Sequence, residues 1–153
     1  METRLRVRYA ETDQMGVVYY ANYLVWMEIG RTDFCAASGF RYRDLETREG
    51  IAIAVAEARC RYRAPARYDD DVLVRTTLER LRRRTLRFSY EILNEGTGQV
   101  LAAGETVHVV VGIRDGRPRA LPDAWHGMLA PWEKNIGTLP DGVQAIIDGD
   151  GEA

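Results

Sequence analysis

The stretch Tyr9–Arg31, YAETDQMGVVYYANYLVWMEIGR, joins a glycine-containing loop to the start of an apolar helix. The loop holds the carboxylate of Asp13, and Gly16 follows three residues later. An acid beside a helix N-terminus can attack a carbonyl or deprotonate water, while the free N–H groups of that terminus can stabilise an oxyanion. The stretch therefore predicts a loop suited to acyl-transfer chemistry.

Helical spacing of apolar residues continues from about Asn22 to Ser38, and Gly39 fits the end of this helix. At about 1.5 Å per residue the helix would span about 25 Å, and its wide apolar stripe predicts that most of it is buried. Glu28 is either a second acid of the site or, as we favour, the ion-pair partner of Arg31 on the helix surface. The stripe consists of Tyr23, Trp26, Met27, Gly30 and Phe34.

Period-two alternation predicts one strand before the loop and four strands after the helix. Short connections among the last four strands favour antiparallel hairpins, and one helix on one curved sheet is an α+β arrangement. Such a sheet leaves an edge and an apolar rim unprotected, which predicts dimerisation. The alternating residues are Leu5, Val7 and Tyr9; Ala54, Ala56, Ala58, Cys60 and Tyr62; Val72, Val74, Thr76 and Leu78; Leu86, Phe88, Tyr90 and Ile92; and Val107, Val109 and Val111.

Composition and charge limit the classes of protein. The chain has 153 residues, of which 46% are hydrophobic and 29% charged, as in one globular domain. No apolar run approaches the about 18 residues of a membrane span, and the N-terminus lacks a signal-peptide core. We therefore expect a cytoplasmic protein without a membrane partner. The expected domain covers residues 1–132, followed by an acidic, flexible tail over residues 133–153.

Arginine is concentrated in one short segment of the chain. Arginine suits bidentate binding of phosphate, although a solvated strand end is the alternative interpretation. The net charge of −2 does not fit a general nucleic-acid-binding protein, so we expect no nucleic-acid partner. The arginines of the segment are Arg80, Arg82, Arg83, Arg84 and Arg87.

The opening stretch resembles the motif of hotdog-fold acyl-CoA thioesterases of the 4-hydroxybenzoyl-CoA thioesterase and Tol–Pal-associated types. The family pattern runs from an aromatic residue through T-D-x-x-G-V-V-Y into a helix with a tyrosine, an aromatic residue, Glu and Arg. The similarity of the strand pattern extends from about Leu5 to Pro122. The matching residues are Tyr9, Thr12-Asp13, Gly16-Val17-Val18-Tyr19, Tyr23, Trp26, Glu28 and Arg31.

The resemblance implies an α+β hotdog fold, in which a long central helix is wrapped by a five- to six-stranded antiparallel sheet. It also implies homodimers, or tetramers that are dimers of dimers, with active sites at the dimer interface. The implied substrate is an acyl-CoA, and the resemblance implies no metal and no redox cofactor.

The resemblance also implies roles for individual residues. The family's catalytic carboxylate falls on Asp13, and the amide that polarises the thioester carbonyl falls on Tyr20. Many bacterial relatives have histidine at the position of Tyr20, so any contribution of that side chain is missing here. Asn22 either caps the helix or contacts the substrate. The positions matched for substrate binding are Gly16, Val17, Tyr19 and Asn22, and those matched for coenzyme A phosphates are Arg82, Arg83, Arg84 and Arg119.

The function that these observations favour is hydrolysis of an aromatic or short- to medium-chain acyl-CoA. Asp13 would act as a nucleophile that forms a mixed anhydride or as a general base on water, and both routes remain open at this stage. The alternatives are a non-catalytic acyl-CoA-binding module and a thioesterase for acyl carrier protein.

Overall fold

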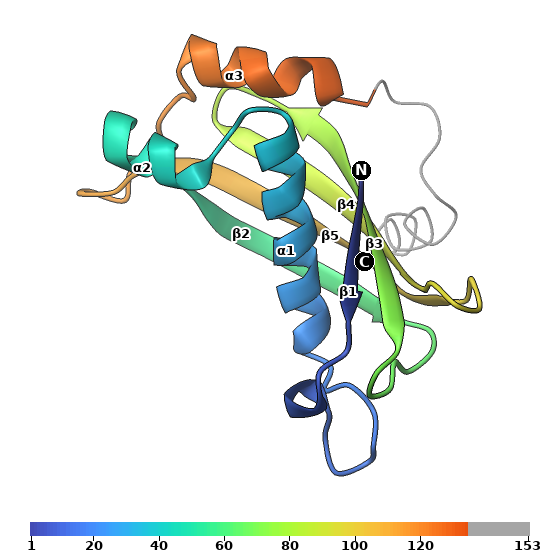
Figure 1. The fold of residues 1–153 in the computed structure, drawn as a ribbon. Helices are drawn as coiled ribbons and strands as arrows, with labels where there is room; N and C mark the ends of the chain where they lie inside the picture. Colours follow the sequence, from blue (N-terminus) through green and yellow to red (C-terminus); the bar gives the residue numbers. More distant parts are fainter. Residues whose placement is uncertain (135–153) are drawn as a thin grey trace, which may run out of the picture.

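The computed structural model describes residues 1–134, which form a five-stranded antiparallel sheet of order β1-β3-β4-β5-β2 (Figure 1). Short connections join β3 to β4 and β4 to β5, and β1 and β2 are the two edge strands. The antiparallel sheet and the α+β class are as predicted. The elements are β1 (Glu2–Arg6), η1 (Tyr9–Glu11), α1 (Asn22–Ala37), α2 (Tyr42–Glu49), β2 (Ile51–Tyr62), β3 (Asp71–Leu81), β4 (Thr85–Asn94), β5 (Val100–Gly112), α3 (Asp123–Leu129) and η2 (Ala130–Trp132).

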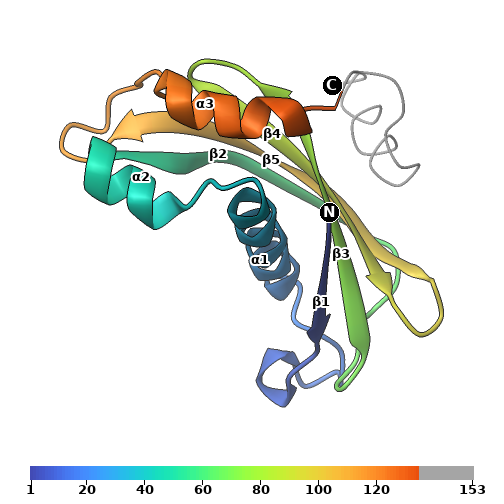
Figure 2. The same ribbon diagram turned by 45° about the horizontal axis from the view of Figure 1, so that its top comes forward.

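Helix α1 packs against the concave face of the curved sheet, and α2 and α3 cover the rest of that face (Figure 2). The buried side of α1 includes Phe34, whose ring meets that of Phe88 on β4 at 5.7 Å. Gly30 permits close approach of the helix to β3, since a Cβ there would lie 2.5 Å from Oγ1 of Thr76. This contact accounts for a mid-helix glycine that otherwise costs about 1 kcal/mol relative to Ala.

The expected long central helix is not confirmed. The helical residues divide among α1, α2 and α3, which have 16, 8 and 7 residues. Within residues 1–134 the sheet has five strands and no sixth. Helix α2 escaped prediction because Leu45 is its one buried residue, so its sequence carries little apolar periodicity.

Two strand predictions need correction. Strand β1 ends at Arg6, and Tyr9 begins the 3₁₀ turn η1 with 78% of its surface exposed. In β2 a bulge interrupts the expected alternation between Val55 and Glu57. Because a bulge adds one unpaired residue, the side chains before it change face relative to those after it.

The predicted surface ion pair between Glu28 and Arg31 is also wrong. Arg31 is 9% exposed, and its guanidinium donates to the Tyr90 hydroxyl at 3.1 Å. The Tyr90 hydroxyl is 2.6 Å from Oγ1 of Thr106, which in turn is 2.7 Å from Nε2 of His108. Burial, and then the nearby Arg31 charge, lower the pKa of His108 to about 3, so this interior imidazole is neutral at pH 7.

The described chain stays attached to the sheet up to its last residue. The Lys134 N–H donates to the Leu78 carbonyl at 2.9 Å, and the Glu133 carboxylate accepts from the Leu81 N–H at 2.9 Å. The rest of the predicted flexible tail lies outside the described residues. Across residues 1–134, no helix is both long and apolar enough to cross a membrane.

Candidate active site

The loop that carries Asp13 is a small, closed hairpin. Thr12 and Val18 form an antiparallel bridge, and the Asp13 N–H donates to the Val17 carbonyl at 2.9 Å. Gly16 turns the chain with φ +76°, a left-handed conformation that glycine adopts without steric strain. The glycine therefore shapes the loop, and it does not line the cavity described below.

The two oxygens of the Asp13 carboxylate differ in their hydrogen bonding. Its Oδ1 accepts from the Met15 N–H at 2.8 Å, which is the turn role that an aspartate often fills. Within the described part of the chain, Oδ2 accepts no hydrogen bond. The side chain is half-buried and lines a cavity of about 320 Å³.

The N-terminus of α1 presents two free amides beside this cavity. The Asn22 N–H is bonded to the Tyr19 carbonyl, whereas the N–H groups of Tyr20 and Ala21 donate to no acceptor in residues 1–134. Ala21 is the N-cap and supplies no side-chain acceptor. Unpaired amides at a helix start favour negative charge on a ligand, so this end of α1 can hold an oxyanion.

The cavity brings the predicted pair together, since both Asp13 and Tyr20 line it. Val17 lines it as well. Tyr19 does not, and its ring lies against that of Tyr20 at 4.6 Å. Asn22 neither caps the helix nor lines the cavity, because its amide donates to the Glu11 carbonyl at 2.9 Å. The complete lining is Asp13, Val17, Val18, Tyr20, Tyr23, Tyr62, Arg63, Ala64 and Pro65.

Tyr62, from the end of β2, is a site residue that sequence reasoning missed. Its hydroxyl donates to the Tyr20 carbonyl at 2.9 Å, and its ring packs edge-on to Tyr23 at 5.1 Å. Burial is the largest cause that raises the pKa of Tyr62, so the hydroxyl stays protonated at neutral pH and can donate. The sequence placed Tyr62 in a strand, but only the fold brings the end of β2 to the start of α1.

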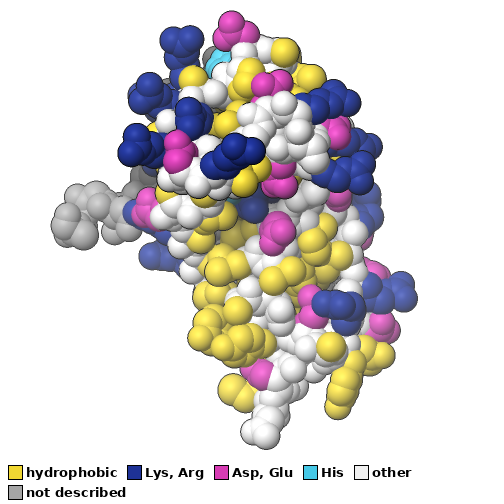
Figure 3. Space-filling view, turned by 90° about the vertical axis from the view of Figure 1, so that its left-hand side faces the viewer, with side chains coloured by type: hydrophobic (Ala, Val, Ile, Leu, Met, Phe, Trp, Pro, Cys, Tyr) yellow, Lys and Arg dark blue, Asp and Glu magenta, His cyan; other side chains and the backbone are white. Residues whose placement is uncertain are grey.

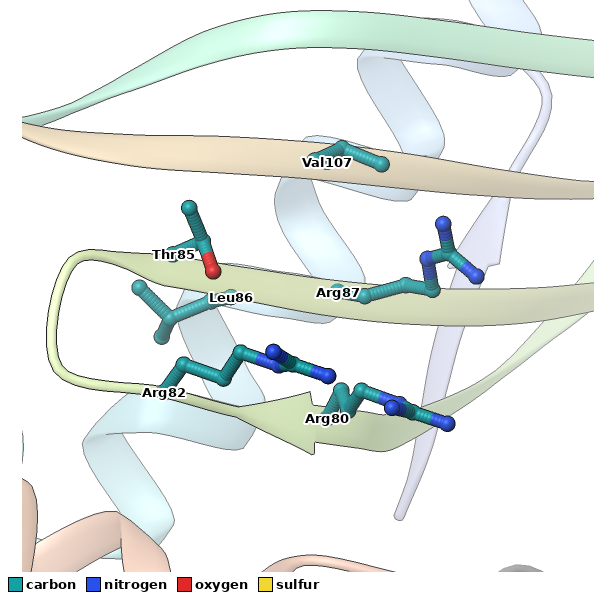
Figure 4. Close-up of a pocket in the computed structure, with 6 residues that line it drawn as sticks. All are labelled: Arg80, Arg82, Thr85, Leu86, Arg87 and Val107. Carbon is teal, nitrogen blue, oxygen red and sulfur yellow. The ribbon is translucent and has the colours of Figure 1, made fainter.

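The arginine segment forms a second cavity, of about 430 Å³, around the β3–β4 hairpin. Figure 4 shows the side chains of Arg80, Arg82 and Arg87 extending in one direction along the hairpin. Of the predicted triplet only Arg82 lines this cavity. Arg83 and Arg84 are exposed, and their carbonyls accept from the N–H groups of Leu121 and Val110.

The arginines of this second cavity have no acidic partner among residues 1–134, where no carboxylate lies within ion-pair distance of them. Arg80 and Arg87 are opposite each other in the β3–β4 register. Like charges directly opposite in a sheet destabilise it, so an external anion between them would be favourable. Sequence spacing did not predict this pair, because the bulge after Leu78 determines which residue of β3 lies opposite Arg87.

Arg119 lies at the same end of the sheet as the arginine cavity. Its guanidinium passes over Gly112 and donates to Asp115 at 2.6 Å. This end is opposite to the Asp13 loop (Figure 1). Since β3 has 11 residues at about 3.3 Å each, the two sites are separated by roughly 30 Å within this chain.

Known proteins are similar to this chain over most of its length. Residues 7–132 match the thioesterase-like superfamily. The putative acyl-CoA thioesterase YneP of Bacillus subtilis is 38% identical over 126 residues, covering 80% of this chain and 89% of that protein. The acyl-CoA thioester hydrolase YbgC of Escherichia coli O6:H1 is 35% identical over 118 residues, covering 77% and 87%.

A solved structure agrees with these relatives. The structure described as DHNA-CoA thioesterase from Staphylococcus aureus superposes with a TM-score of 0.81 at 29% identity, covering 99% of this chain and 95% of that chain. The family match spans the Asp13 loop, α1 and the strands β2 to β5. The chain therefore belongs to the thioesterase-like superfamily, as the stretch Tyr9–Arg31 predicted.

Proposed function

We propose that this protein hydrolyses the thioester bond of an acyl-CoA to a free acid and coenzyme A. The observation that carries the proposal is that Asp13 and Tyr20 line one cavity, beside the free N–H groups at the start of α1. Close relatives are named as acyl-CoA thioesterases or thioester hydrolases, which supports the same reaction.

The chain's own groups suffice for the steps of the reaction. The thioester carbonyl carbon is attacked by Asp13, or by a water molecule whose proton Asp13 takes, and the carbonyl electrons move to the oxygen. The N–H groups of Tyr20 and Ala21 stabilise this oxyanion. Collapse of the intermediate breaks the C–S bond and releases the coenzyme A thiolate. In the first route, water then hydrolyses the mixed anhydride and restores the Asp13 carboxylate. In the second route, the protonated Asp13 gives its proton to the thiolate, which restores the carboxylate and leaves free coenzyme A.

The rings around the cavity favour an aromatic acyl group. Tyr20, Tyr23 and Tyr62 meet at edge-to-face angles and present aromatic surface beside Asp13. Aromatic rings pack well against such edges and faces. The relative named 1,4-dihydroxy-2-naphthoyl-CoA hydrolase in Thermosynechococcus vestitus is 30% identical over 122 residues, and the aromatic acyl group in its name supports this choice. Short and medium aliphatic chains are the second candidate.

A panel of acyl-CoAs tests the reaction and the substrate together. Free-thiol release should be measured with aromatic, short-chain and long-chain acyl-CoAs and with an acyl carrier protein thioester. We expect the highest kcat/KM on an aromatic acyl-CoA. Faster release from the carrier protein would favour that donor instead. Binding of all acyl-CoAs without thiol release would show a binding module and refute the proposed hydrolysis.

The arginine cavity is the proposed site for the phosphates of coenzyme A. Its arginines have no acidic partner in residues 1–134, and the guanidinium fork matches phosphate oxygens. Within one subunit this cavity is roughly 30 Å from Asp13. We therefore expect the arginines of one subunit to serve the catalytic loop of another.

The exposed surface of α1 and the free edge of β2 support a dimer that would bring these sites together. β2 is an edge strand of 12 residues. Hydrophobic side chains gather on the side of the molecule that carries α1 and β2 (Figure 3). A two-fold axis beside β2 reverses the partner's sheet, so its β3–β4 end comes to the side of the first subunit's Asp13. The exposed apolar residues of this rim are Leu24, Val25, Ile29 and Val55.

Substitution of Arg80 and Arg87 by glutamine is expected to raise KM for acyl-CoA by about 10- to 100-fold with little change in kcat. The arginines would bind the nucleotide end in the ground state and the transition state alike. Steady-state kinetics at two salt concentrations measure this effect, with Arg41→Gln, an exposed arginine outside the cavity, as the control. An unchanged KM in the double variant would place the phosphates elsewhere.

A further inference from the structure

Glu11 is a buried carboxylate two residues before Asp13, and only 5% of its surface is exposed. Burying a carboxylate is unfavourable unless its oxygens are hydrogen-bonded. Here both oxygens are: Oε2 accepts from the indole N–H of Trp26 at 2.8 Å, and Oε1 accepts from the backbone N–H of Arg8 at 2.9 Å. Trp26 is fully buried in α1. The carboxylate therefore links the turn η1 to the body of α1.

The main chain of Glu11 holds the other side of the same loop. Its carbonyl accepts from the Tyr19 N–H at 2.9 Å and from the Asn22 side-chain amide at 2.9 Å. Tyr19 directly precedes Tyr20, which lines the cavity and whose N–H donates to no acceptor in residues 1–134. Glu11 thus holds both parts of the proposed site. It lies two residues before Asp13, and its carbonyl binds Tyr19, the residue before the Tyr20 amide.

We propose that Glu11 is a positioning residue for thioester hydrolysis. Its carboxylate anchors the loop on Trp26 and thereby sets the separation between the Asp13 carboxylate and the Tyr20 N–H. The inference rests on the proposed function, in which these two groups act on the thioester. Glu11 itself does not line the cavity. Because a displacement of about 1 Å can lower a rate about 10²-fold, a bond outside the cavity can control turnover.

Two variants change the two partners of the Glu11–Trp26 hydrogen bond separately. In Glu11→Gln, the amide NH₂ must face either the Arg8 N–H or the Trp26 N–H, so one hydrogen bond is lost. In Trp26→Phe, the Glu11 carboxylate remains and only the indole donor and part of the ring are removed. We expect each variant to lower kcat by about 10- to 100-fold, with KM and the affinity for coenzyme A within about threefold of wild type.

The control uses a second tryptophan with the same kind of bond. Trp125 is buried in α3, and its indole N–H donates to the Glu49 carboxylate at 3.4 Å, far from Asp13. Trp125→Phe should lose stability in urea unfolding without loss of kcat. The separate values of kcat and KM are the second measurement. We expect kcat alone to fall in Glu11→Gln and neither constant to change in Trp125→Phe.

The double variant Glu11→Gln/Trp26→Phe should lose little more kcat than the single variant with the larger loss, because both changes act on the same Glu11–Trp26 interaction. A folded Glu11→Gln or Trp26→Phe enzyme with kcat within about twofold of wild type would overturn the proposal. If Glu11→Gln does not fold, Trp26→Phe decides. An equal loss of kcat in Trp125→Phe would also overturn it. No thiol release from any acyl-CoA by the wild-type protein would instead refute the proposed function, whatever Glu11 does.

Discussion

Replacing Asp13 with asparagine is expected to lower kcat for acyl-CoA hydrolysis by at least about 10²-fold and to leave the fold intact. Asparagine has no basic or nucleophilic oxygen, so neither attack on the thioester nor proton abstraction from water can proceed. Its carbonyl oxygen can still accept from the Met15 N–H, the bond that Oδ1 of Asp13 accepts at 2.8 Å. Thiol release under saturating acyl-CoA measures the loss.

The control for this substitution is Asp70→Asn. The Asp70 carboxylate is also half-buried in a turn, where it accepts from the Arg67 N–H at 2.9 Å, and it does not line the cavity. It should keep wild-type kcat. Coenzyme A affinity should be unchanged in both variants, because Asp13 is proposed to act on the acyl carbon rather than on the nucleotide. Near-wild-type turnover in Asp13→Asn would remove Asp13 from the mechanism.

A lysine at Val55 is expected to convert the proposed dimer to a monomer and to abolish turnover. Val55 lies on the free edge of β2 with 54% of its surface exposed, beside the apolar side of α1. Two lysines brought together across a two-fold axis repel each other and lose hydration, and lysine on a strand edge opposes pairing. If the phosphate cavity and Asp13 come from different subunits, the monomer holds only half of each site.

Sedimentation velocity measures the first effect, and thiol release at several protein concentrations measures the second. Tyr68→Lys is the matched control, because Tyr68 is 58% exposed but lies on the β2–β3 connection rather than on the edge of β2. It should stay dimeric and active. A wild-type protein that sediments as an active monomer would exclude the shared site. So would a monomeric Val55→Lys variant with full activity.

Local sequence predicted the Asp13 loop because its features depend on near neighbours. Asp13, Gly16 and the start of α1 lie within one short stretch, so loop geometry and helix periodicity place them together without long-range contacts. The strand pattern was predicted for the same reason, since alternation needs only adjacent residues. The predicted alternation fails in β2, where a bulge moves the side chains on one side of it to the opposite face of the sheet.

Contacts between distant segments decided the rest of the site. Tyr62 reaches the Tyr20 carbonyl across 42 residues, and Arg87 faces Arg80 only because a bulge sets the β3–β4 register. Arg31 does not pair with Glu28 as predicted, because its guanidinium donates to the hydroxyl of Tyr90, a core residue of β4.

The sequence by itself determined the fold class and the family, and it predicted Asp13 as the residue that acts on the thioester, because these follow from periodicity and from one contiguous motif. Only the tertiary structure decided which residues surround Asp13, which arginines share a cavity, and that Glu11 ties the loop to Trp26. Those choices depend on register, bulges and hydrogen bonds between segments far apart in the chain, which spacing along the sequence does not encode.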